Sequence, residues 1–193
     1  TRTFTIDKGV LRATVKSYSG TYNGSVHTFM EPVITMAASG TTTVYYSTVQ
    51  ELTQENYLNA GSTTRPVRTN PGTTVVYYYI TDDQGYCYPV MGSTFIAVKP
   101  QCTVAGYSGT YDGSEHTVSA GYSAGATIYF STEKELDINN YQTDGTSEIP
   151  QRTSAGTTTV YYLAVPDSNA DENSVVSGST TIIIDKAEPD LTV

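Results

Sequence analysis

The chain has 193 residues, a formal net charge of −9 at pH 7 and only ten Lys and Arg residues. Such an acidic chain repels the phosphates of nucleic acids and the surface of anionic membranes, so neither is an expected partner. The sequence holds no apolar run of about 18 residues, the length that a membrane-spanning helix needs. Thr, Ser, Gly, Tyr and Val dominate, which favours strands and turns over helices.

The sequence contains one pattern twice. Residues 18–28 (YSGTYNGSVHT) return as residues 107–117 (YSGTYDGSEHT), at an offset of 107 − 18 = 89 residues. Residues 44–48 (VYYST) return as residues 128–132 (IYFST), at an offset of 128 − 44 = 84 residues. The first copy therefore carries 89 − 84 = 5 additional residues between the two blocks. A period near 90 residues is too long for a solenoid repeat and fits a whole small domain.

Similar segments mark where one copy stops and the next begins. Ile-Asp-Lys occurs at residues 6–8 and again at residues 184–186. The organisation that this predicts is the end of a preceding repeat or a leader strand over 1–7, a first repeat over 8–98, a second over 99–186, and the start of a following repeat over 187–193. We therefore expect the chain to be a piece of a longer tandem array with almost no linker between repeats.

Within each copy, strands and tight turns come first. The opening strands are expected at 11–15 and 102–104, where apolar and β-branched residues gather. Tight turns follow at 22–25 and 111–114, because Asn-Gly and Asp-Gly supply the φ > 0 conformations that such turns need. The strand after each turn carries a histidine. The next strands are expected at 42–46 and 127–130.

One short helix is expected in each copy after these strands. Thr48-x-x-Glu51 and Thr132-x-x-Glu135 both have the capping-box pattern, in which a hydroxyl and a carboxylate satisfy free backbone N–H groups. The pattern predicts a helical turn or two over 49–55 and 133–139.

A glycine-led strand follows in each copy, over 72–80 and 156–165. It resembles the E–F corner and F strand of immunoglobulin-type sandwiches. Side chains alternate across a strand, so we assign the phase of Val76, Tyr78 and Ile80 to the core and the opposite phase to solvent. The final strands are expected at 93–98 and 179–184. The predicted fold class is all-β: two tandem Ig-like β-sandwich domains, each with one short helical turn.

The Tyr-(Asn/Asp)-Gly-x-x-His turn, the Gly-Thr-Thr-x-Val-Tyr-Tyr strand and the closing Ile-x-Lys-Ala resemble the Ig-like tandem repeats of bacterial cell-surface proteins, known as YDG or MBG-type repeats. The resemblance covers both copies, although the first ends in Val98-Lys99-Pro100 instead. It implies an extracellular protein at the cell surface or cell wall, whose repeats act as stalks or adhesive modules. It implies neither catalytic residues nor a cofactor.

Two features have a functional and a structural interpretation. The functional interpretation makes His27 and His116 ligand or metal contacts, yet each lacks a second His or a Cys at ligand spacing. We favour a structural turn motif, formed by Tyr22, Gly24, His27, Tyr111, Gly113 and His116. The loop at 167–173 is rich in the oxygen ligands of calcium, but it lacks an EF-hand spacing, and a solvated hairpin is favoured.

The two cysteines are expected to be unpaired. Cys87 and Cys102 should lie at opposite ends of a strand of six or more residues, roughly 20 Å apart, whereas bridged Cα atoms lie within about 7 Å.

The candidate ligand contacts are tyrosines. They are either an aromatic face for a glycan or ordinary fillers of half-buried strands. The five candidates are Tyr45, Tyr77, Tyr79, Tyr129 and Tyr161.

No nucleophile elbow or phosphate-binding loop is present, so an enzyme is not expected. The favoured function is a stalk whose partners are neighbouring repeats of the same chain. The alternatives are an adhesin for host glycan or glycoprotein, and an accessory module of a secreted carbohydrate-active enzyme.

Overall fold

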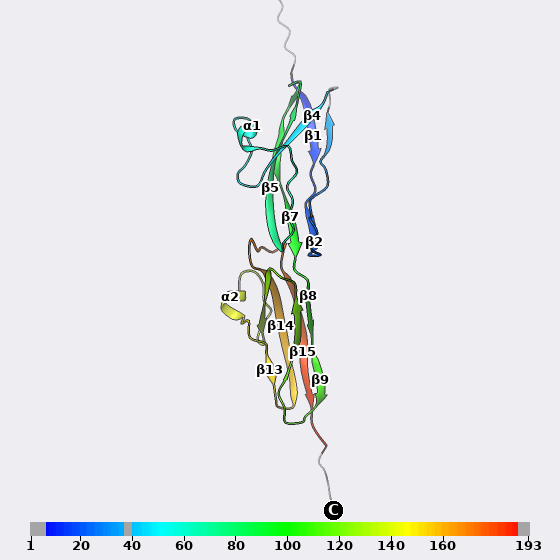
Figure 1. The fold of residues 1–193 in the computed structure, drawn as a ribbon, viewed down its shortest axis with the longest axis vertical. Helices are drawn as coiled ribbons and strands as arrows, with labels where there is room; N and C mark the ends of the chain where they lie inside the picture. The colour runs from blue at the N-terminus through cyan, green and yellow to red at the C-terminus, as the bar shows by residue number, and fades with distance from the viewer. Residues whose placement is uncertain (1–6, 37–39, 189–193) are drawn as a thin grey trace, which may run out of the picture. The chain divides into compact units, whose positions relative to one another are not determined.

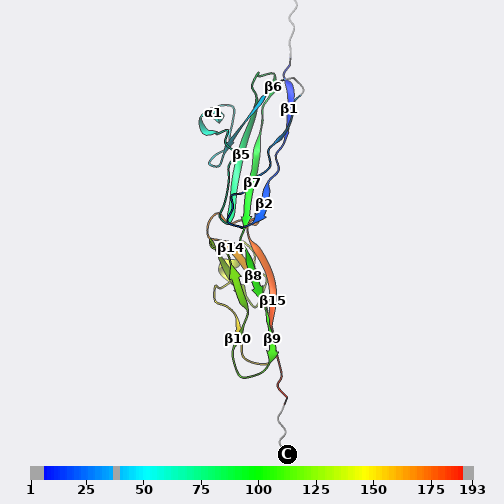
Figure 2. The same cartoon turned by 45° about the vertical axis from the view of Figure 1, so that its right-hand side comes forward.

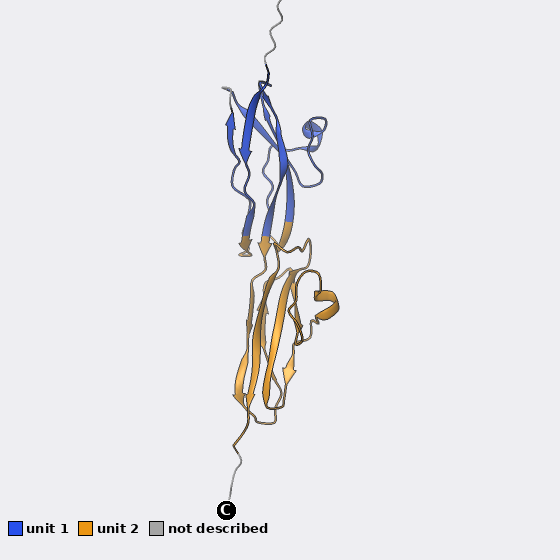
Figure 3. Cartoon of the chain, turned by 180° about the vertical axis from the view of Figure 1, so that it is seen from behind, with its two compact units in different colours: residues 1–19, 25–69, 74–97 blue, residues 20–24, 70–73, 98–193 orange. Residues whose placement is uncertain are grey.

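The computed structural model describes residues 7–36 and 40–188. The predicted leader strand at 1–7 and the predicted start of a further repeat at 187–193 lie almost wholly outside these residues. The chain divides into two compact units, coloured separately in Figure 3. Unit 1 comprises residues 1–19, 25–69 and 74–97, and unit 2 comprises residues 20–24, 70–73 and 98–193.

The first sequence copy forms two sheets (Figures 1 and 2). Four strands lie in the order β2-β7-β5-β4, and three lie in the order β3-β1-β6. The elements are β1 (Gly9–Thr14), β2 (Tyr18–Thr21), β3 (Val33–Met36), β4 (Thr42–Ser47), α1 (Tyr57–Ala60), β5 (Gly72–Asp82), β6 (Cys87–Tyr88) and β7 (Val90–Lys99).

The second copy repeats the four-stranded sheet in the order β12-β14-β15-β9 and opposes it with two pairs, β8-β11 and β10-β13. The elements are β8 (Cys102–Ala105), β9 (Tyr107–Thr110), β10 (His116–Thr117), β11 (Ser119–Tyr122), β12 (Ala126–Ser131), α2 (Tyr141–Asp144), β13 (Gln151–Arg152), β14 (Gly156–Pro166) and β15 (Val176–Asp185). Strands dominate both copies and each holds one short helix, so the predicted all-β, Ig-like fold class is confirmed.

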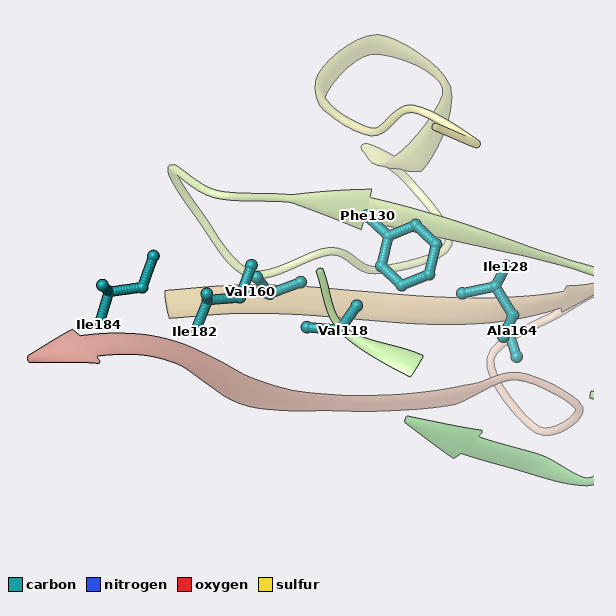
Figure 4. Close-up of a cluster of buried hydrophobic side chains, with 7 residues drawn as sticks. All are labelled: Val118, Ile128, Phe130, Val160, Ala164, Ile182 and Ile184. Carbon is teal, nitrogen blue, oxygen red and sulfur yellow. The ribbon is translucent and has the colours of Figure 1, made fainter. Parts of the chain in front are cut away.

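The core of unit 2 lies between these layers and is made of branched and aromatic side chains (Figure 4). Its buried members are Val118, Ile128, Phe130, Val160, Ala164, Ile182 and Ile184. Burying such side chains is the main favourable term in the folding of each domain. The predicted core phase of the glycine-led strands is confirmed, because Val76, Ile80, Val160 and Ala164 are all fully buried.

The assignment of the opposite phase to solvent is wrong for the second half of each strand. Val75 is exposed as expected, yet Tyr79 is 2% exposed, and its counterpart Leu163 is 1% exposed. The loop that contains the helix packs over this half of the sheet, and in unit 2 Leu136 and Tyr141 contact the cluster around Leu163. Each central strand is therefore covered on both faces over part of its length.

The helices also lie later in the chain than the capping boxes predict. The structure has them at Tyr57–Ala60 and Tyr141–Asp144, and residues 49–55 form turns instead. In the first copy, the hydroxyl that accepts the free N–H groups of Val49 and Gln50 is that of Ser47, one residue before Thr48.

Asparagines fix the turn that precedes each helix. The Asn56 amide donates to the Glu51 carbonyl at 3.0 Å and accepts from the Thr53 N–H at 2.7 Å. Asn140 makes the equivalent pair of bonds in the second copy.

The Asn-Gly and Asp-Gly turns have the predicted backbone geometry. Gly24 has φ = 77° and Gly113 has φ = 81°. A residue with a Cβ atom is strained in this left-handed region, whereas glycine is not. The turn residues therefore account for the strong similarity of the two motifs.

A buried carboxylate closes the hairpin between β5 and β6. Asp82 is 4% exposed and accepts hydrogen bonds from the backbone N–H groups of Gln84, Tyr86 and Cys87, at 3.0, 2.7 and 3.0 Å. The bond to Cys87 is buried and the other two are partly buried, and a buried N–H group needs a protein acceptor because water does not reach it. The neighbouring Asp83 is exposed and accepts only from two threonine hydroxyls.

We predict that Asp82→Ala destabilises the first repeat by about 3 kcal/mol, because it leaves three N–H groups without an acceptor. Asp83→Ala is the matched control and should change stability by less than about 0.5 kcal/mol. Urea unfolding of the whole chain, followed by tyrosine fluorescence, measures both. Equal effects of the two substitutions would show that burial of the Asp82 carboxylate has no special role.

Candidate functional site

Three of the five candidate tyrosines attach the helix-containing loop to the sheet. In the first copy the Tyr57 ring stacks on Tyr79 at 4.4 Å between centroids and meets Tyr45 edge-on at 4.9 Å. In the second copy Tyr141 meets Tyr129 edge-on at 4.8 Å. Burial, with Tyr57 and Glu55 nearby, raises the pKa of the Tyr79 hydroxyl. These rings pack against protein rather than forming an open aromatic face.

The other two candidates, Tyr77 and Tyr161, line equivalent cavities in the two copies. The first cavity has a volume of about 170 Å³, and the second about 160 Å³. Glu51, Leu52, Thr53, Tyr77, Met91, Gly92 and Ser93 line the first. Glu135, Leu136, Tyr161, Tyr162, Ser177, Gly178 and Ser179 line the second. The repeat places a Glu-Leu pair, a tyrosine, a glycine and a serine around both.

The register of the sheet explains how the second cavity arises. Tyr161 on β14 pairs with Ser179 on β15, and Leu163 pairs with Ser177. The side chains of Ser177 and Ser179 are small, so they leave space above β15 beside Tyr161. The loop residue Leu136 packs over Leu163. A hollow therefore forms on the outer face of the sheet, at the edge of the part that the loop covers.

A glycine in the same stretch of β15 leaves room for a tyrosine side chain of β14 on the other face of the sheet. Gly178 pairs with Tyr162, whose hydroxyl lies where a Cβ atom on Gly178 would be. Gly92 stands in the same relation to Tyr78 in the first copy, where a Cβ atom would lie 2.6 Å from the hydroxyl oxygen. A larger residue would displace the tyrosine that packs against the core at this point.

Four polar side chains around the second cavity have no hydrogen-bond partner among the described residues. Within the described ranges, the hydroxyls of Tyr161, Ser177 and Ser179 and the carboxylate of Glu135 make no hydrogen bond or ion pair. Tyr161 is half-buried, and the other three are exposed. The arrangement offers hydroxyl donors, hydroxyl acceptors and one carboxylate to a small polar molecule.

The histidine motif is structural in its geometry. In the first copy the His27 ring stacks on Tyr18 at 5.1 Å, and its Nδ1 lies 2.6 Å from the tyrosine hydroxyl. In the second copy His116 stacks on Tyr107 at 4.0 Å. In both copies the histidine side chain therefore packs against a tyrosine. Tyr22 is half-buried in the turn, and Tyr111 is exposed.

An arginine that sequence reasoning did not single out completes each motif. The His116 strand β10 pairs with the Arg152 strand β13. The Arg152 guanidinium donates to the Ser154 and Ala155 carbonyls and to the Thr158 hydroxyl. The signal was present, because Pro-x-Arg-x-x-x-Gly occurs at 66–72 and again at 150–156. The arginine fixes the start of β14 rather than serving a ligand.

The Asp171 carboxylate of the acidic loop at 167–173 is engaged in hydrogen bonds with protein groups. Asp171 accepts from the Thr73 hydroxyl, the Asn173 amide groups and the Ser174 hydroxyl, all within unit 2. Burial opposes ionisation, but these hydrogen bonds outweigh it and lower the pKa of the Asp171 carboxyl. Within residues 7–36 and 40–188, no three His, Cys, Asp or Glu side chains are grouped so as to hold a metal ion.

Cys87 is buried, Cys102 is half-buried, and both are free thiols. Burial raises the pKa of Cys102, which disfavours the reactive thiolate. No helix in the described residues has the length and apolar character needed to cross a membrane.

No protein-family model matches the chain, and no curated protein does. Among solved structures, the chain is similar to Sidekick-1 immunoglobulin domains 1–4, with 13% identity and a TM-score of 0.36, over 95% of this chain and 50% of that one. It is similar to the titin I-band fragment I67–I69, with 10% identity and a TM-score of 0.34, over 94% and 67%.

A third similarity is to the Clostridium thermocellum CbhA fibronectin(III)-like modules, with 12% identity and a TM-score of 0.25, over 91% and 95%. The chain spans half the length of the Sidekick-1 structure. The fold assignment rests on the strands and sheets themselves.

The two turns differ at one position, which predicts a difference in their response to acid. Asp112 lies 3.0 Å from His116 Nε2 and accepts from the Ser114 N–H at 2.8 Å, whereas the first copy has Asn23. The Ser114 N–H and then His116 lower the pKa of the Asp112 carboxyl. Because the folded-state pKa is depressed, the stabilisation is present above the unfolded pKa of about 4 and is lost as the pH falls through the folded-state value.

Asp112→Asn should therefore reduce the fall in the melting temperature of the second repeat between about pH 5 and pH 3. Asn23→Asp, the reciprocal change, should increase that fall for the first repeat. Differential scanning calorimetry at both pH values checks the pair. An unchanged pH dependence in both variants would exclude a role for this carboxyl.

Proposed function

We propose that the chain is a non-catalytic pair of Ig-like repeats, over 8–98 and 99–186, which serves as a load-bearing spacer or stalk of a bacterial cell-surface protein. The resemblance of its repeat motifs to those of bacterial surface proteins supports this location, outside the cell and at the surface or wall. The acidic net charge of −9 suits a solvated surface array. Its partners in this role are the neighbouring repeats of the same chain.

One observation carries the proposal: in the second repeat, a strand near the start of the repeat pairs in parallel with its last strand. β9 lies beside β15, with Tyr107 opposite Ile182 and Thr110 opposite Asp185. Beyond the strand ends, the Tyr111 N–H donates to the Asp185 carbonyl at 2.8 Å. The chain enters this repeat through β8, continues after one residue into β9, and leaves just after β15.

The first repeat has the corresponding strand order at this edge. β2 lies beside β7 at the edge of the four-stranded sheet. The Tyr22 N–H donates to the Lys99 carbonyl at 2.8 Å, which matches the bond between Tyr111 and Asp185.

Parallel pairing of these strands determines how a pulling force acts. A force on the two ends of a repeat pulls β9 and β15 in opposite directions along their own axes. The hydrogen bonds of a ladder run across the strands, so they share this load together instead of opening one after another. A repeat of this kind resists extension, which is the physical requirement for a spacer that transmits force.

We predict that Tyr111→Pro lowers the force at which the second repeat unfolds, because proline removes the N–H that bonds to Asp185. Tyr111→Ala keeps this N–H and is the matched control. Single-molecule pulling of the whole chain should show two unfolding events, each releasing roughly 300 Å of chain for a repeat of about 90 residues. The substitution should lower the force of one event only.

Tyr22→Pro and Tyr22→Ala repeat the comparison in the first repeat. If both repeats of the unaltered chain extend without a measurable force peak, the load-bearing role is excluded. If the proline and alanine variants give the same force, the terminal ladder is not the element that resists.

A further inference from the structure

We infer that the Tyr77 and Tyr161 cavities are two copies of a binding site for one unit of a neutral saccharide. This inference goes beyond the spacer role and does not depend on it. The two cavities occupy the same place in both repeats, on the outer face of the four-stranded sheet between the helix-containing loop and the last strand. The recurrence makes a chance hollow in one loop an insufficient explanation.

The chemistry of the second cavity matches a sugar ring. A saccharide presents many hydroxyls, each a donor and an acceptor, together with patches of C–H. Ser177 and Ser179 supply hydroxyls of the same dual character, and Glu135 supplies a carboxylate that accepts from hydroxyl donors. Tyr161 contributes an aromatic ring against which C–H groups pack, and a hydroxyl that has no partner in the described chain.

The first cavity keeps the same chemistry with one change. Glu51, Tyr77 and Ser93 take the places of Glu135, Tyr161 and Ser179, and Met91 replaces Ser177. Met91 is 51% exposed, so the first cavity has an apolar rim where the second has a hydroxyl. We therefore expect both sites to bind the same class of ligand, with different preferences among sugars.

The size of each cavity limits the ligand. Volumes of about 160 and 170 Å³ are below the range of about 300–1,000 Å³ typical of pockets for drug-sized molecules. One ring therefore fits, while the remainder of a longer glycan stays in solvent. Affinity for a single unit should be weak, with a Kd on the order of 1 mM.

Charge excludes the acidic sugars. The chain carries a net charge of −9, and each cavity has a glutamate that makes no ion pair within residues 7–36 and 40–188. A sialylated or sulfated glycan would bring its own negative charge beside this carboxylate. A basic peptide is the competing ligand, but it would use only the carboxylate and the ring and would leave the serine hydroxyls without a match.

The test is an NMR titration of the intact chain with methyl β-galactoside, methyl α-mannoside and methyl β-N-acetylglucosaminide, each to roughly 50 mM. We expect at least one of them to shift the amide signals of residues lining both cavities and to saturate. N-acetyl-arginine amide and sialyllactose are the comparison probes and should shift these signals less.

Tyr161→Ala should weaken binding at the second cavity by about tenfold or more while leaving the first unchanged, and Tyr77→Ala should do the reverse. Tyr122→Ala is the matched control, because Tyr122 is 55% exposed and does not line either cavity. Glu135→Gln keeps the shape of the side chain, so it tests the carboxylate should the alanine variant fold poorly.

Three outcomes would overturn the inference. The first is that no neutral glycoside shifts these amides at the highest concentration. The second is that the arginine probe binds more tightly than every sugar, which would identify a basic peptide as the ligand. The third is that Tyr122→Ala weakens binding as much as Tyr161→Ala. None of them would alter the unfolding forces that test the spacer role.

Discussion

The sheet register and the core packing of each repeat depend on a central strand that is covered on both faces. β14 contributes Val160 and Ala164 to the core on one side and Leu163 to the cluster under the helix-containing loop on the other. A strand buried in this way cannot slip by one residue, because a slip would exchange its two apolar sets. Its fixed register in turn positions β12 on one side and β15 on the other.

The consequences reach both proposed roles. Because β15 is held against β14 along its length, it is a firm partner for β9, and the parallel ladder between them can carry load. The same register sets the small residues Ser177 and Ser179 beside Tyr161 and creates the cavity. The two proposed roles are compatible, because the parallel ladder lies along the edge of β15 and the cavity lies on the face of β14 and β15.

The repeat, the main strands and the tight turns could be predicted because each has a local cause. Asn23-Gly24 and Asp112-Gly113 specify a left-handed residue whatever surrounds them, and the alternation around Val76 marks a buried face. The burial of Tyr79 could not be predicted from alternation, because it depends on Tyr57, a residue far away in the sequence. Tyr45 packs against Tyr57 as well, and Tyr129 packs against Tyr141, so these contacts too depend on residues of the helix-containing loop.

The helices illustrate a different limit. Thr48-x-x-Glu51 has the form of a capping box, yet the structure uses Ser47 and Asn56 to satisfy the backbone there. Hydroxyl and amide side chains in such a segment can bond to nearby backbone groups in several ways, so the sequence pattern alone does not specify which of them is used. The cavities escaped prediction because they require the glutamate of this loop and the serines of the last strand to meet in space.

Different side chains hold the connection into the last strand in the two repeats. This difference is relevant to the folding of a tandem array. Neighbouring domains with nearly identical strands can exchange them while unfolded and become trapped in misassembled forms. In the first repeat Asp82 accepts hydrogen bonds from three N–H groups of the turn that follows β5. The matching position in the second repeat is Pro166, and there Asp171 accepts hydrogen bonds from Asn173 and Ser174 instead. The two connections therefore carry different local signals, although the strands on either side of them are similar in sequence.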